Sequence, residues 1–420
     1  MENNKLKIGL IGLGTVGQGV VKVLSKYDNI EIISCAVKNL NKKRDVEVKN
    51  LTDNPMEIAN NPNIDVVVEV AGGTNIKDTL LCAIKNKKHI VTANKELLAK
   101  YGAELFDAAR ENNVAILYEA AVAGGIPIIM PIKTSLKAND FSSVAGILNG
   151  TTNYILTKME EENLSYEDCL KKAQELGYAE TDPTNDVEGF DSKFKIAILA
   201  NIVFNKRIDI NKIYNEGITK ISSLDIQIAN ELGYKIKLIA QAKRIQNSDE
   251  LDIRVHPMLI KKQEAISEIK NATNAVLLTG FPVDNVMFVG PGAGEFPTTS
   301  SVVGDILSIK SEYLNKGQIL PMTICHHKEY ASQIQIEETV NCYYLRIEAK
   351  NKLGIIGAIG CACEKYGINL SSVVQKGINQ NGSATILVVT EESKEKNINE
   401  MISMLENSGD IKVVNKIRVK

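Results

Sequence analysis

The stretch Leu6–Val20, LKIGLIGLGTVGQGV, decides the fold of the first part of the chain. Its apolar run to Leu13 predicts a buried strand, and the amphipathic pattern that follows predicts a helix to about Lys26. The glycines between them have the GxGxxG spacing of a pyrophosphate-binding turn: the first permits the tight turn, the second lets the backbone approach, and the third allows close helix–strand packing. Because a second strand is expected at Ile30–Val37, we predict a dinucleotide-binding βαβ unit; a glycine-rich loop without a ligand is the alternative.

The identity of the dinucleotide depends on the end of the second strand. We expect cofactor contacts from the turn itself, at Gly12, Leu13, Gly14, Thr15, Val16 and Gly17. Lys38 lies where an NAD-selective fold usually carries Asp or Glu, and three more basic residues follow at 42–44. A cation at this place suits the 2′-phosphate of NADP, so NADP is favoured, although NAD is possible. A solvated basic loop is the alternative.

Two further buried strands are predicted at Ile64–Val70 and His89–Thr92, each followed by small or polar residues. Ligands of a doubly wound sheet bind at the carboxyl ends of the strands, so Gly73 and Thr92 are expected at the cofactor. Lys95 directly precedes a helix, where the macrodipole disfavours a lysine. It is therefore a candidate for holding the nicotinamide ribose or a substrate oxygen, with an ordinary helix-terminal lysine as the alternative.

A second domain is predicted from about Asp140. A strand at Phe141–Asn149, a turn at Gly150–Asn153 and a helix to Glu161 come first, and Ser165 predicts the start of another helix. Four later runs predict a mostly antiparallel sheet with one face in water: Ile236–Ile245, Leu251–Val255, Ala275–Thr279 and Val286–Val289. A glycine-rich run at 290–294 then leads to a helix near Ser300 and either returns to the cofactor or forms a plain turn.

Residues 173–195, AQELGYAETDPTNDVEGFDSKFK, carry the candidate chemistry. If a helix begins near Val187, Asp191 and Lys195 stand one turn apart on a face that continues into the apolar run after Lys195. Partial burial lowers the pKa of such a lysine, which makes it a usable proton donor or acceptor near neutral pH, although Asp191 opposes the shift. The alternative is an ordinary i,i+4 salt bridge worth a few tenths of a kcal/mol.

This segment resembles the homoserine dehydrogenases position by position, at Ala173, Gly177, Tyr178, Asp182, Pro183, Asp186, Gly189, Asp191 and Lys195. Four more stretches resemble the same family in the same order: IGLGTVGQGV from Ile11, VTANKELLA from Val91, EAAVAGGIPII from Glu119 and GILNGTTNYIL from Gly146. The resemblance therefore covers nearly the whole chain. It implies reversible, NAD(P)-dependent reduction of L-aspartate 4-semialdehyde to L-homoserine, on the route to threonine and methionine.

The resemblance also implies roles for single residues. Glu180 would hold the substrate amino group, Asp191 would orient the hydroxyl, and Lys195 would give a proton to the aldehyde oxygen. Asp186 and Lys95 are further expected substrate contacts, and Lys95, Gly177 and Gly292 further cofactor contacts. A monovalent cation such as Na⁺ is implied at Glu119 and the backbone oxygens of Val122, Gly124 and Ile126. Close packing of small residues after a strand at Val114–Tyr118 is the alternative there.

From about Val340 the pattern changes to a βαββαβ order, which is ferredoxin-like. This part resembles an ACT domain, an amino-acid-binding module whose ligand lies between a strand and the first helix of paired domains. Threonine is the expected effector. The turn at Asn351–Gly354 departs from the usual Asp-x-x-Gly, so a dimerisation module without a ligand is the alternative.

The predicted fold class is α/β, in three parts. A Rossmann-type doubly wound nucleotide-binding domain is expected at 1–135, completed by 292–325. An α+β catalytic and dimerisation domain is expected at 136–291, and a ferredoxin-like ACT domain at 339–420 after a linker at 326–338. We expect a homodimer or a homotetramer.

Composition limits the partners of the chain. Its 420 residues carry a formal net charge of -2, with 49 Lys and Arg against 51 Asp and Glu, which argues against nucleic acid or a membrane as partner. Without a signal-peptide pattern or a long apolar run, we expect a cytoplasmic protein that acts on a small-molecule substrate. The 7 scattered cysteines are expected to be reduced thiols.

Three other functions compete with this interpretation. An aspartate semialdehyde dehydrogenase needs an activated cysteine, and none of the cysteines stands in a recognisably activating setting. A fused aspartate kinase is not expected, because the first strand begins almost at Met1. The alternative from another class is a regulator that binds a dinucleotide and an amino acid without turnover.

Overall fold

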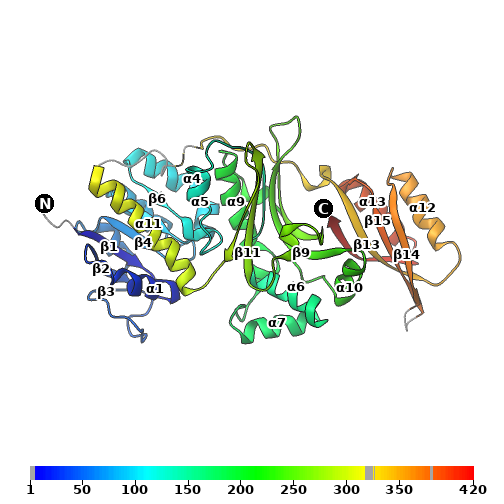
Figure 1. Ribbon diagram of the computed structural model, residues 1–420, viewed down its shortest axis with the longest axis horizontal. Coiled ribbons are helices and arrows are strands. Elements are labelled where there is room, and N and C mark those ends of the chain that lie inside the picture. The colour runs from blue at the N-terminus through cyan, green and yellow to red at the C-terminus, as the bar shows by residue number, and fades with distance from the viewer. Residues whose placement is uncertain (1–4, 317–324, 326, 379–381) are drawn as a thin grey trace. The chain divides into compact units, whose positions relative to one another are not determined.

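The computed structural model describes residues 5–316, 325, 327–378 and 382–420 (Figure 1). The chain divides into two compact units, each assembled from three segments. The first unit comprises Met1–Gly150, Asp191–Asn211 and Ala272–Ala331, and the second comprises Thr151–Phe190, Lys212–Asn271 and Ser332–Lys420. Residues 317–324 and 326 fall in the predicted completion of the nucleotide-binding domain and in the predicted linker, and they lie outside the described residues.

The first unit contains a six-stranded parallel sheet with the order β3-β2-β1-β4-β5-β6. Its strands are β1 (Leu6–Ile11), β2 (Ile30–Ala36), β3 (Leu51–Thr52), β4 (Val66–Glu69), β5 (His89–Thr92) and β6 (Ile116–Leu117). The direction of the strand order reverses between β1 and β4, which is the place where doubly wound sheets bind their ligands. The predicted parallel-sheet nucleotide-binding domain is confirmed.

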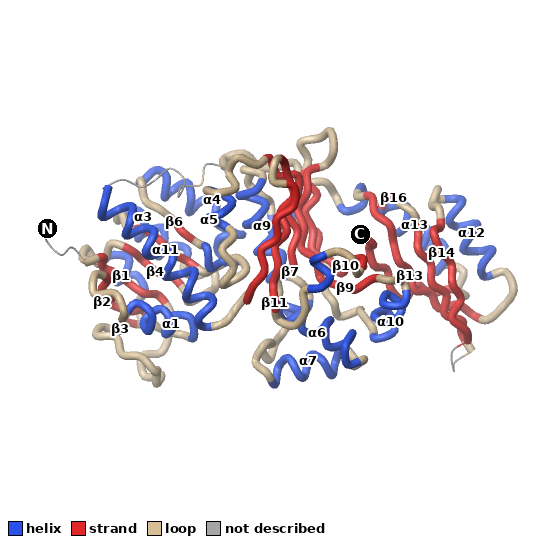
Figure 2. The backbone as a smooth tube through the Cα atoms, viewed as in Figure 1, coloured by secondary structure: helices blue, strands red, loops and turns tan. Residues whose placement is uncertain are grey.

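Helices pack around this sheet (Figure 2). They include α1 (Thr15–Leu24), α2 (Pro55–Asn60), α3 (Lys77–Lys85), α4 (Lys95–Asn112) and α11 (Glu295–Lys316). Alternate residues of β1 such as Ile8 are fully buried, and Val20 of α1 and Ile306 of α11 belong to the same apolar core. Thus α11, which is distant in the sequence, contributes to the core of the nucleotide-binding sheet.

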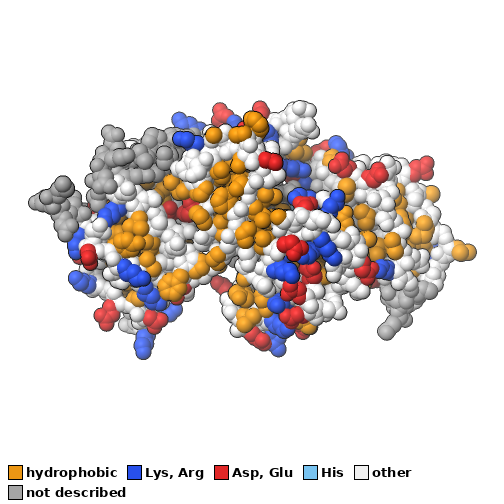
Figure 3. Space-filling model, in the orientation of Figure 1, with side chains coloured by type: hydrophobic (Ala, Val, Ile, Leu, Met, Phe, Trp, Pro, Cys, Tyr) orange, Lys and Arg blue, Asp and Glu red, His pale blue; other side chains and the backbone are white. Residues whose placement is uncertain are grey.

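The first unit also holds an antiparallel sheet in the order β12-β11-β7. Its strands are β7 (Asp140–Ile147), β11 (Thr273–Phe281) and β12 (Asp284–Pro291), and the short α5 (Ile129–Lys133) and the longer α9 (Phe190–Val203) belong to the same unit. The outer strand β12 leaves Val289 exposed and Val286, Met287 and Phe288 only partly buried. Hydrophobic side chains gather over this part of the unit in Figure 3.

The second unit begins with helices and a long hairpin. Its elements before the C-terminal module are α6 (Gly150–Glu162), α7 (Tyr166–Glu175), α8 (Thr184–Val187), β8 (Tyr214–Asn215), α10 (Ser223–Glu231), β9 (Tyr234–Arg244) and β10 (Leu251–Lys261). The prediction that one face of the sheet lies in water is wrong for β10, because its residues 251–260 are all buried. The buried Arg254 of this strand finds partners inside the unit: it donates to Thr339 Oγ1 at 3.2 Å and to Asn341 Oδ1 at 2.8 Å.

The C-terminal module of the second unit has a ferredoxin-like topology. Its elements are β13 (Val340–Lys350), α12 (Ile355–Lys365), β14 (Leu370–Ile378), β15 (Ser383–Thr390), β16 (Ser393–Lys394), α13 (Glu395–Glu406) and β17 (Ile411–Val419). The strand order β17-β13-β15-β14 is that of a βαββαβ sheet with both helices on the connections. Strand β17 also pairs with β10 in parallel, at Met258 with Arg418 and Leu259 with Val419.

Two predicted helix starts differ from the structure. The predicted turn at Gly150–Asn153 is instead the first turn of α6, and its residues Thr151 and Thr152 are buried. The helix expected from Val187 is split into α8 and α9, because Gly189 between them has φ +82°, which does not continue a right-handed helix. Among the helices within the described ranges, none is long and apolar enough to cross a membrane.

Candidate active site

The glycine-rich turn joins β1 to α1. Gly12 has φ +101°, which favours glycine, and its N–H donates to Ala36 O at 2.9 Å. A Cβ on Gly17 would lie 2.2 Å from Gly12 O, whereas a Cβ on Gly14 would meet nothing within 4 Å. No side chain caps the first turn of α1. Backbone N–H groups are therefore presented beside an open approach, and the turn fits a dinucleotide pyrophosphate.

The ends of β4 and β5 are tied together by Glu69, a residue that sequence reasoning missed. Its Oε2 accepts a hydrogen bond from Thr92 Oγ1 at 2.6 Å, and its Oε1 accepts from the N–H groups of Ala71 and Gly72, both at 2.9 Å. Burial raises the pKa of the Glu69 carboxyl, and these hydrogen bonds oppose the rise. The sequence feature that could have identified Glu69 is an acidic residue at the end of an otherwise apolar strand.

Asn94 extends this network toward Lys95. Its Nδ2 donates to Gly73 O at 2.7 Å, and its Oδ1 accepts from Leu97 N at 3.0 Å, so Asn94 caps α4. Lys95 is then the first residue of α4. The structure thus brings the predicted residues Gly73, Thr92 and Lys95 to neighbouring strand ends of one sheet.

Lys38 is exposed directly after β2 and starts a basic loop. Arg44 holds this loop by donating to Asn39 O at 2.7 Å and to Lys42 O at 2.8 Å. The loop is also attached to α1, because the N–H of Asp45 donates to Gln18 Oε1 at 2.7 Å. The role of Lys38 toward a 2′-phosphate stays a prediction.

The Asp191 carboxylate lies between two ammonium groups. Its Oδ1 is 2.8 Å from Lys95 Nζ, and its Oδ2 is 2.7 Å from Lys195 Nζ. Lys195 also donates to Leu148 O at 2.7 Å, and Asn149 Nδ2 donates to Asp191 Oδ2 at 2.9 Å. Three segments of the first unit therefore converge on one carboxylate: α4, α9 and the chain that leaves β7.

Sequence reasoning found part of this cluster. It placed Asp191 and Lys195 on one inward face, and the structure confirms that both are buried, at 5% and 7% exposed. Lys95 was predicted as a site residue, but its ion pair with Asp191 was not. No role was predicted for Asn149 or Leu148. The only signal for those two was their place in the stretch GILNG at residues 146–150.

The electrostatics of the cluster are decided by the two lysines. Burial alone would raise the pKa of the Asp191 carboxyl, but the Lys195 and Lys95 ammonium groups hold it well below its ordinary value. Asp191 is therefore ionised at neutral pH. With both lysines protonated, the three groups carry one net positive charge, which favours a substrate oxygen that becomes negative during reaction.

Three predicted ligand contacts belong to the second unit. Gly177 follows α7 with φ +74°, Glu180 is exposed, and Asp186 lies in α8. The backbone oxygen of Glu180 accepts a hydrogen bond from Gln174 Nε2 at 3.1 Å. Contacts of these residues with substrate or cofactor stay predictions.

Glu119, the predicted cation ligand, caps a helix. Its Oε1 accepts from the N–H groups of Ile128 and Ile129 at 2.5 and 2.7 Å, and its Oε2 accepts from Met130 N at 2.8 Å. The carboxylate thus occupies the N-terminus of α5, where its charge is favourable. Its own N–H donates to Asp305 Oδ2 at 2.9 Å, and burial raises the pKa of Asp305 well above its ordinary value.

The loop after Glu119 packs tightly against the predicted cofactor residue Gly292. A Cβ on Gly124 would lie 2.4 Å from Gly292 O, and a Cβ on Gly292 would lie 2.1 Å from the Asn274 side chain. The backbone oxygen of Gly124 accepts from Ser301 Oγ at 2.7 Å. These contacts favour the close-packing alternative for this loop, and the cation at Val122, Gly124 and Ile126 stays a prediction.

The cysteines of the chain offer no activated nucleophile where pKa shifts are resolved. Burial raises the pKa of the Cys35 thiol to about 12 and that of the Cys169 thiol to about 11. Burial also raises the pKa of Cys342 and Cys363. A catalytic thiolate requires the opposite shift, so these four cysteines do not support thiol-dependent aldehyde oxidation.

The fold and the cluster together define a class: a dinucleotide-dependent oxidoreductase, with a phosphate-binding turn on a parallel sheet and a buried Asp–Lys pair nearby in the same unit. Comparisons with known proteins identify the family. Residues 12–119 match the model "Homoserine dehydrogenase, NAD binding domain", and residues 127–307 match the model "Homoserine dehydrogenase". The chain therefore belongs to the homoserine dehydrogenase family.

Individual relatives agree with the family models. The homoserine dehydrogenase of Synechocystis sp. is 42% identical over 405 residues, which is 93% of each chain. The crystal structure of a homoserine dehydrogenase from Thiobacillus denitrificans is 37% identical, with a TM-score of 0.93 over 99% of this chain and 98% of that one. A homoserine dehydrogenase structure from S. aureus is 33% identical, with a TM-score of 0.77 and 99% coverage of both chains.

Proposed function

We propose that the chain interconverts L-aspartate 4-semialdehyde and L-homoserine with a nicotinamide cofactor, in the cytoplasm, on the route to threonine and methionine. The observation that carries this proposal is the buried Asp191 carboxylate between the Lys95 and Lys195 ammonium groups. Carbonyl reduction needs a proton donor and a positive environment at one oxygen, and this cluster supplies both.

Lys195 acts on the reacting oxygen. When bound, the nicotinamide supplies the hydride, which reaches the aldehyde carbon. The carbonyl π electrons move to the oxygen, and Lys195 Nζ gives that oxygen a proton, so the aldehyde becomes an alcohol. In the oxidation of homoserine, neutral Lys195 accepts the hydroxyl proton as hydride leaves.

Asp191 and Lys95 position the reacting group. The ionised Asp191 carboxylate fixes the Lys195 ammonium at 2.7 Å and orients the substrate hydroxyl. Since Lys195 already balances the charge of Asp191, Lys95 gives the three groups their net positive charge, which stabilises a developing alkoxide. Glu180 binds the substrate ammonium and Asp186 assists it, as the family resemblance implies.

The cofactor preference follows from Lys38. We propose NADP, because an exposed ammonium after β2 pairs with a 2′-phosphate, whereas an NAD-selective fold would carry an acid there. Gly292 and Gly177 are proposed as further cofactor contacts. A monovalent cation such as Na⁺ is proposed at Glu119 and the carbonyls of residues 122, 124 and 126, where its contribution would be structural.

The ferredoxin-like module is proposed to be an ACT domain that pairs across a homodimer or homotetramer and responds to threonine. Its topology supports this assignment. Self-association is supported by the half-exposed apolar side chains of the edge strand β12.

One experiment tests the reaction. Purified protein is mixed with L-homoserine and NADP⁺, and the absorbance of the reduced nicotinamide is followed. We expect a steady increase that Lys195→Ala abolishes. If homoserine and cofactor bind but no reduced cofactor forms, the chain is instead the non-catalytic sensor.

A further inference from the structure

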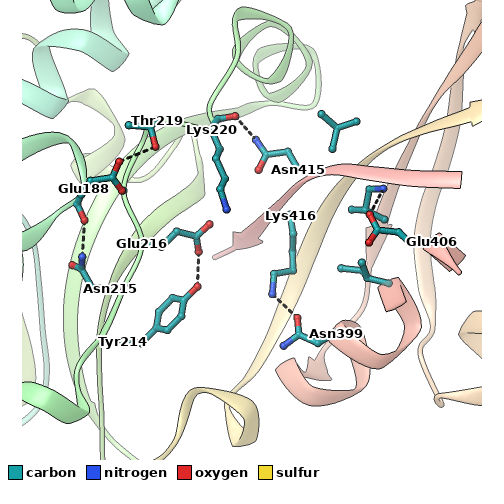
Figure 4. A pocket seen from close by; sticks show the side chains of 14 residues that line it. Glu188, Tyr214, Asn215, Glu216, Thr219, Lys220, Asn399, Glu406, Asn415 and Lys416 are labelled. Atoms are coloured by element: carbon teal, nitrogen blue, oxygen red, sulfur yellow. Dashed lines mark hydrogen bonds between the residues drawn. The ribbon is translucent and has the colours of Figure 1, made fainter. Parts of the chain in front are cut away.

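The surroundings of Glu69 differ from those of the carboxylates in contact with water. In the second unit, a cavity of about 510 Å³ lies between the segment 214–220 and the α13–β17 side of the C-terminal module, and Glu188, Glu216 and Glu406 line it (Figure 4). These three residues are partly buried or exposed. Glu69 of the first unit is 0% exposed, and among the residues that the structure describes no cation forms an ion pair with it. A carboxyl group in such a place costs free energy unless hydrogen-bond donors replace water.

Three donors surround the Glu69 carboxyl group. The N–H groups of Ala71 and Gly72 donate to Oε1, both at 2.9 Å, and Thr92 Oγ1 donates to Oε2 at 2.6 Å. Thr92 Oγ1 in turn accepts from the N–H of Asn94 at 3.0 Å. Glu69 and Thr92 already stand opposite each other in the pairing of β4 with β5. What the side chain of Glu69 adds is therefore the attachment of the two segments that leave these strands.

The turn after β4 depends on such an attachment. Gly72 and Gly73 have φ values of +76° and +78°, a conformation that favours glycine, and glycine loses the most conformational freedom on folding. The turn also packs against the glycine-rich turn after β1, because a Cβ on Gly12 would lie 2.7 Å from Ala71 N. Glu69 thus fixes a flexible turn that adjoins the predicted cofactor turn.

Both attachments meet at Asn94. Its backbone N–H is held by Thr92 Oγ1 at 3.0 Å, and its Nδ2 is held by Gly73 O at 2.7 Å. Glu69 binds Thr92 directly and Gly73 through the preceding residues of the turn. Asn94 Oδ1 then caps α4 by accepting from Leu97 N at 3.0 Å. The position of the first turn of α4 therefore depends on Glu69.

We propose that Glu69 is a positioning residue of the enzyme, which fixes the start of α4 so that the Lys95 ammonium stays on Asp191 Oδ1 during the reaction. Lys95 is the first residue of α4, and its Nζ lies 2.8 Å from that oxygen. The Lys95 side chain is 42% exposed, so its ammonium is held mainly by where the helix begins. The inference rests on the proposed reaction, in which Glu69 acts through Lys95 and touches no reacting atom.

Glu69→Gln tests this role with little change in size. The amide oxygen can still accept from the two N–H groups after β4, but the NH₂ group then faces Thr92 Oγ1, which already receives the N–H of Asn94. At saturating NADP⁺, kcat/KM for homoserine oxidation should fall about tenfold or more, because a misplacement of about 1 Å can cost about 10²-fold. Glu31→Gln makes the same change at a partly buried residue of β2 outside this network and should leave kcat/KM unchanged.

A double-mutant cycle separates positioning from a purely structural role. Lys95→Met removes the ammonium that Glu69 is proposed to position. In that background, Glu69→Gln should change kcat/KM by less than about twofold, because the two substitutions act on one interaction. The same cycle is run on the Kd of homoserine in the presence of NADPH, measured by calorimetry, since this complex does not turn over. The Kd cycle decides the question if Lys95→Met is too slow to assay.

Asn94→Ser is a second probe of the same connection. Serine still caps α4 but cannot donate to Gly73 O, so only one of the two attachments is lost. We expect kcat/KM to fall severalfold when Lys95 is present and to change little in Lys95→Met. If Glu69→Gln does not fold, this comparison decides the proposal.

The possible failures are distinguishable. A wild type that forms no reduced nicotinamide from homoserine and NADP⁺ would overturn the proposed function and this inference with it. The inference alone fails if the wild type is active and Glu69→Gln retains its full kcat/KM and Kd. It also fails if Glu69→Gln causes the same loss in Lys95→Met as it does when Lys95 is present.

Discussion

Lys195→Ala tests the chemistry at the centre of the site. The substitution removes the Nζ hydrogen bonds to Asp191 Oδ2 and Leu148 O, both at 2.7 Å. A positioned proton donor contributes about 10²–10⁴-fold to a rate. Since a factor of ten corresponds to about 1.36 kcal/mol, the expected rise in the barrier is about 3–5 kcal/mol.

Folding is expected to suffer less than catalysis. Removing one partner of a buried ion pair costs about 3–5 kcal/mol when the other charge is left alone. Asp191 is not left alone, because Lys95 at 2.8 Å and Asn149 at 2.9 Å still bind it. Lys195→Met keeps the length and the apolar stem of the side chain. It should therefore fold like the wild type and lose as much activity as Lys195→Ala.

The assay separates chemistry from cofactor binding. We expect kcat for homoserine oxidation to fall about 10²–10⁴-fold in both variants, while the Kd for NADPH, from fluorescence quenching, stays nearly constant. Lys193→Met on the same helix is the matched control, because Lys193 is partly buried and lies outside the Asp191 cluster. Wild-type kcat in Lys195→Met would refute the proton-donor role.

Further predictions concern the charges around this site and the regulatory module. Asp191→Asn should weaken the binding of homoserine more than the binding of NADP. Equal losses of affinity for both in binding titrations would indicate a purely structural role. The folded-state pKa of Asp191 is lowered, so its stabilising contribution is complete above its unfolded pKa of about 3.9 and is lost as the pH falls through the folded value. Urea unfolding should therefore show a wild-type advantage over Asp191→Asn at pH 7 that shrinks below about pH 4. Lys38→Glu should raise the Kd for NADP and lower or preserve that for NAD, because a carboxylate repels a 2′-phosphate but accepts from a 2′-hydroxyl; affinities that change together would exclude Lys38 from the site. Millimolar threonine should inhibit the full chain but not a chain ending at Glu338, and an indifferent full-length enzyme without heat of binding would leave the module a dimerisation element.

Local patterns predicted the elements that depend on neighbouring residues. The GxGxxG spacing at 12–17 specified a strand–turn–helix, because the steric demands of each glycine are set within that turn. The Asp191–Lys195 pair was predictable as well, since an i,i+4 spacing fixes two side chains on one helix face whatever surrounds the helix. The βαββαβ order of the C-terminal module was predictable too, because the hydrophobic periodicity that distinguishes a strand from a helix lies within each segment.

Partners that are distant in the sequence could not be read in this way. Nothing near Lys95 indicates that it pairs with Asp191, and nothing near Leu148 indicates that its carbonyl binds Lys195. Glu119 was predicted as a cation ligand, and nothing near it in the sequence indicates that its carboxylate also caps α5, because the folded loop brings three N–H groups to it.

The sequence by itself determined the family, the nucleotide-binding turn, and the two residues Asp191 and Lys195 that the proposed chemistry requires. Only the tertiary structure decided that two ammonium groups share one carboxylate, that both faces of β10 are buried, and that charged groups line a cavity beside residues 187–189. The physical reason is the distance along the chain over which each interaction acts. Backbone sterics and helical periodicity act over a few residues and are written in local sequence, whereas the pairing of buried charges depends on which strand and helix ends the whole fold brings together.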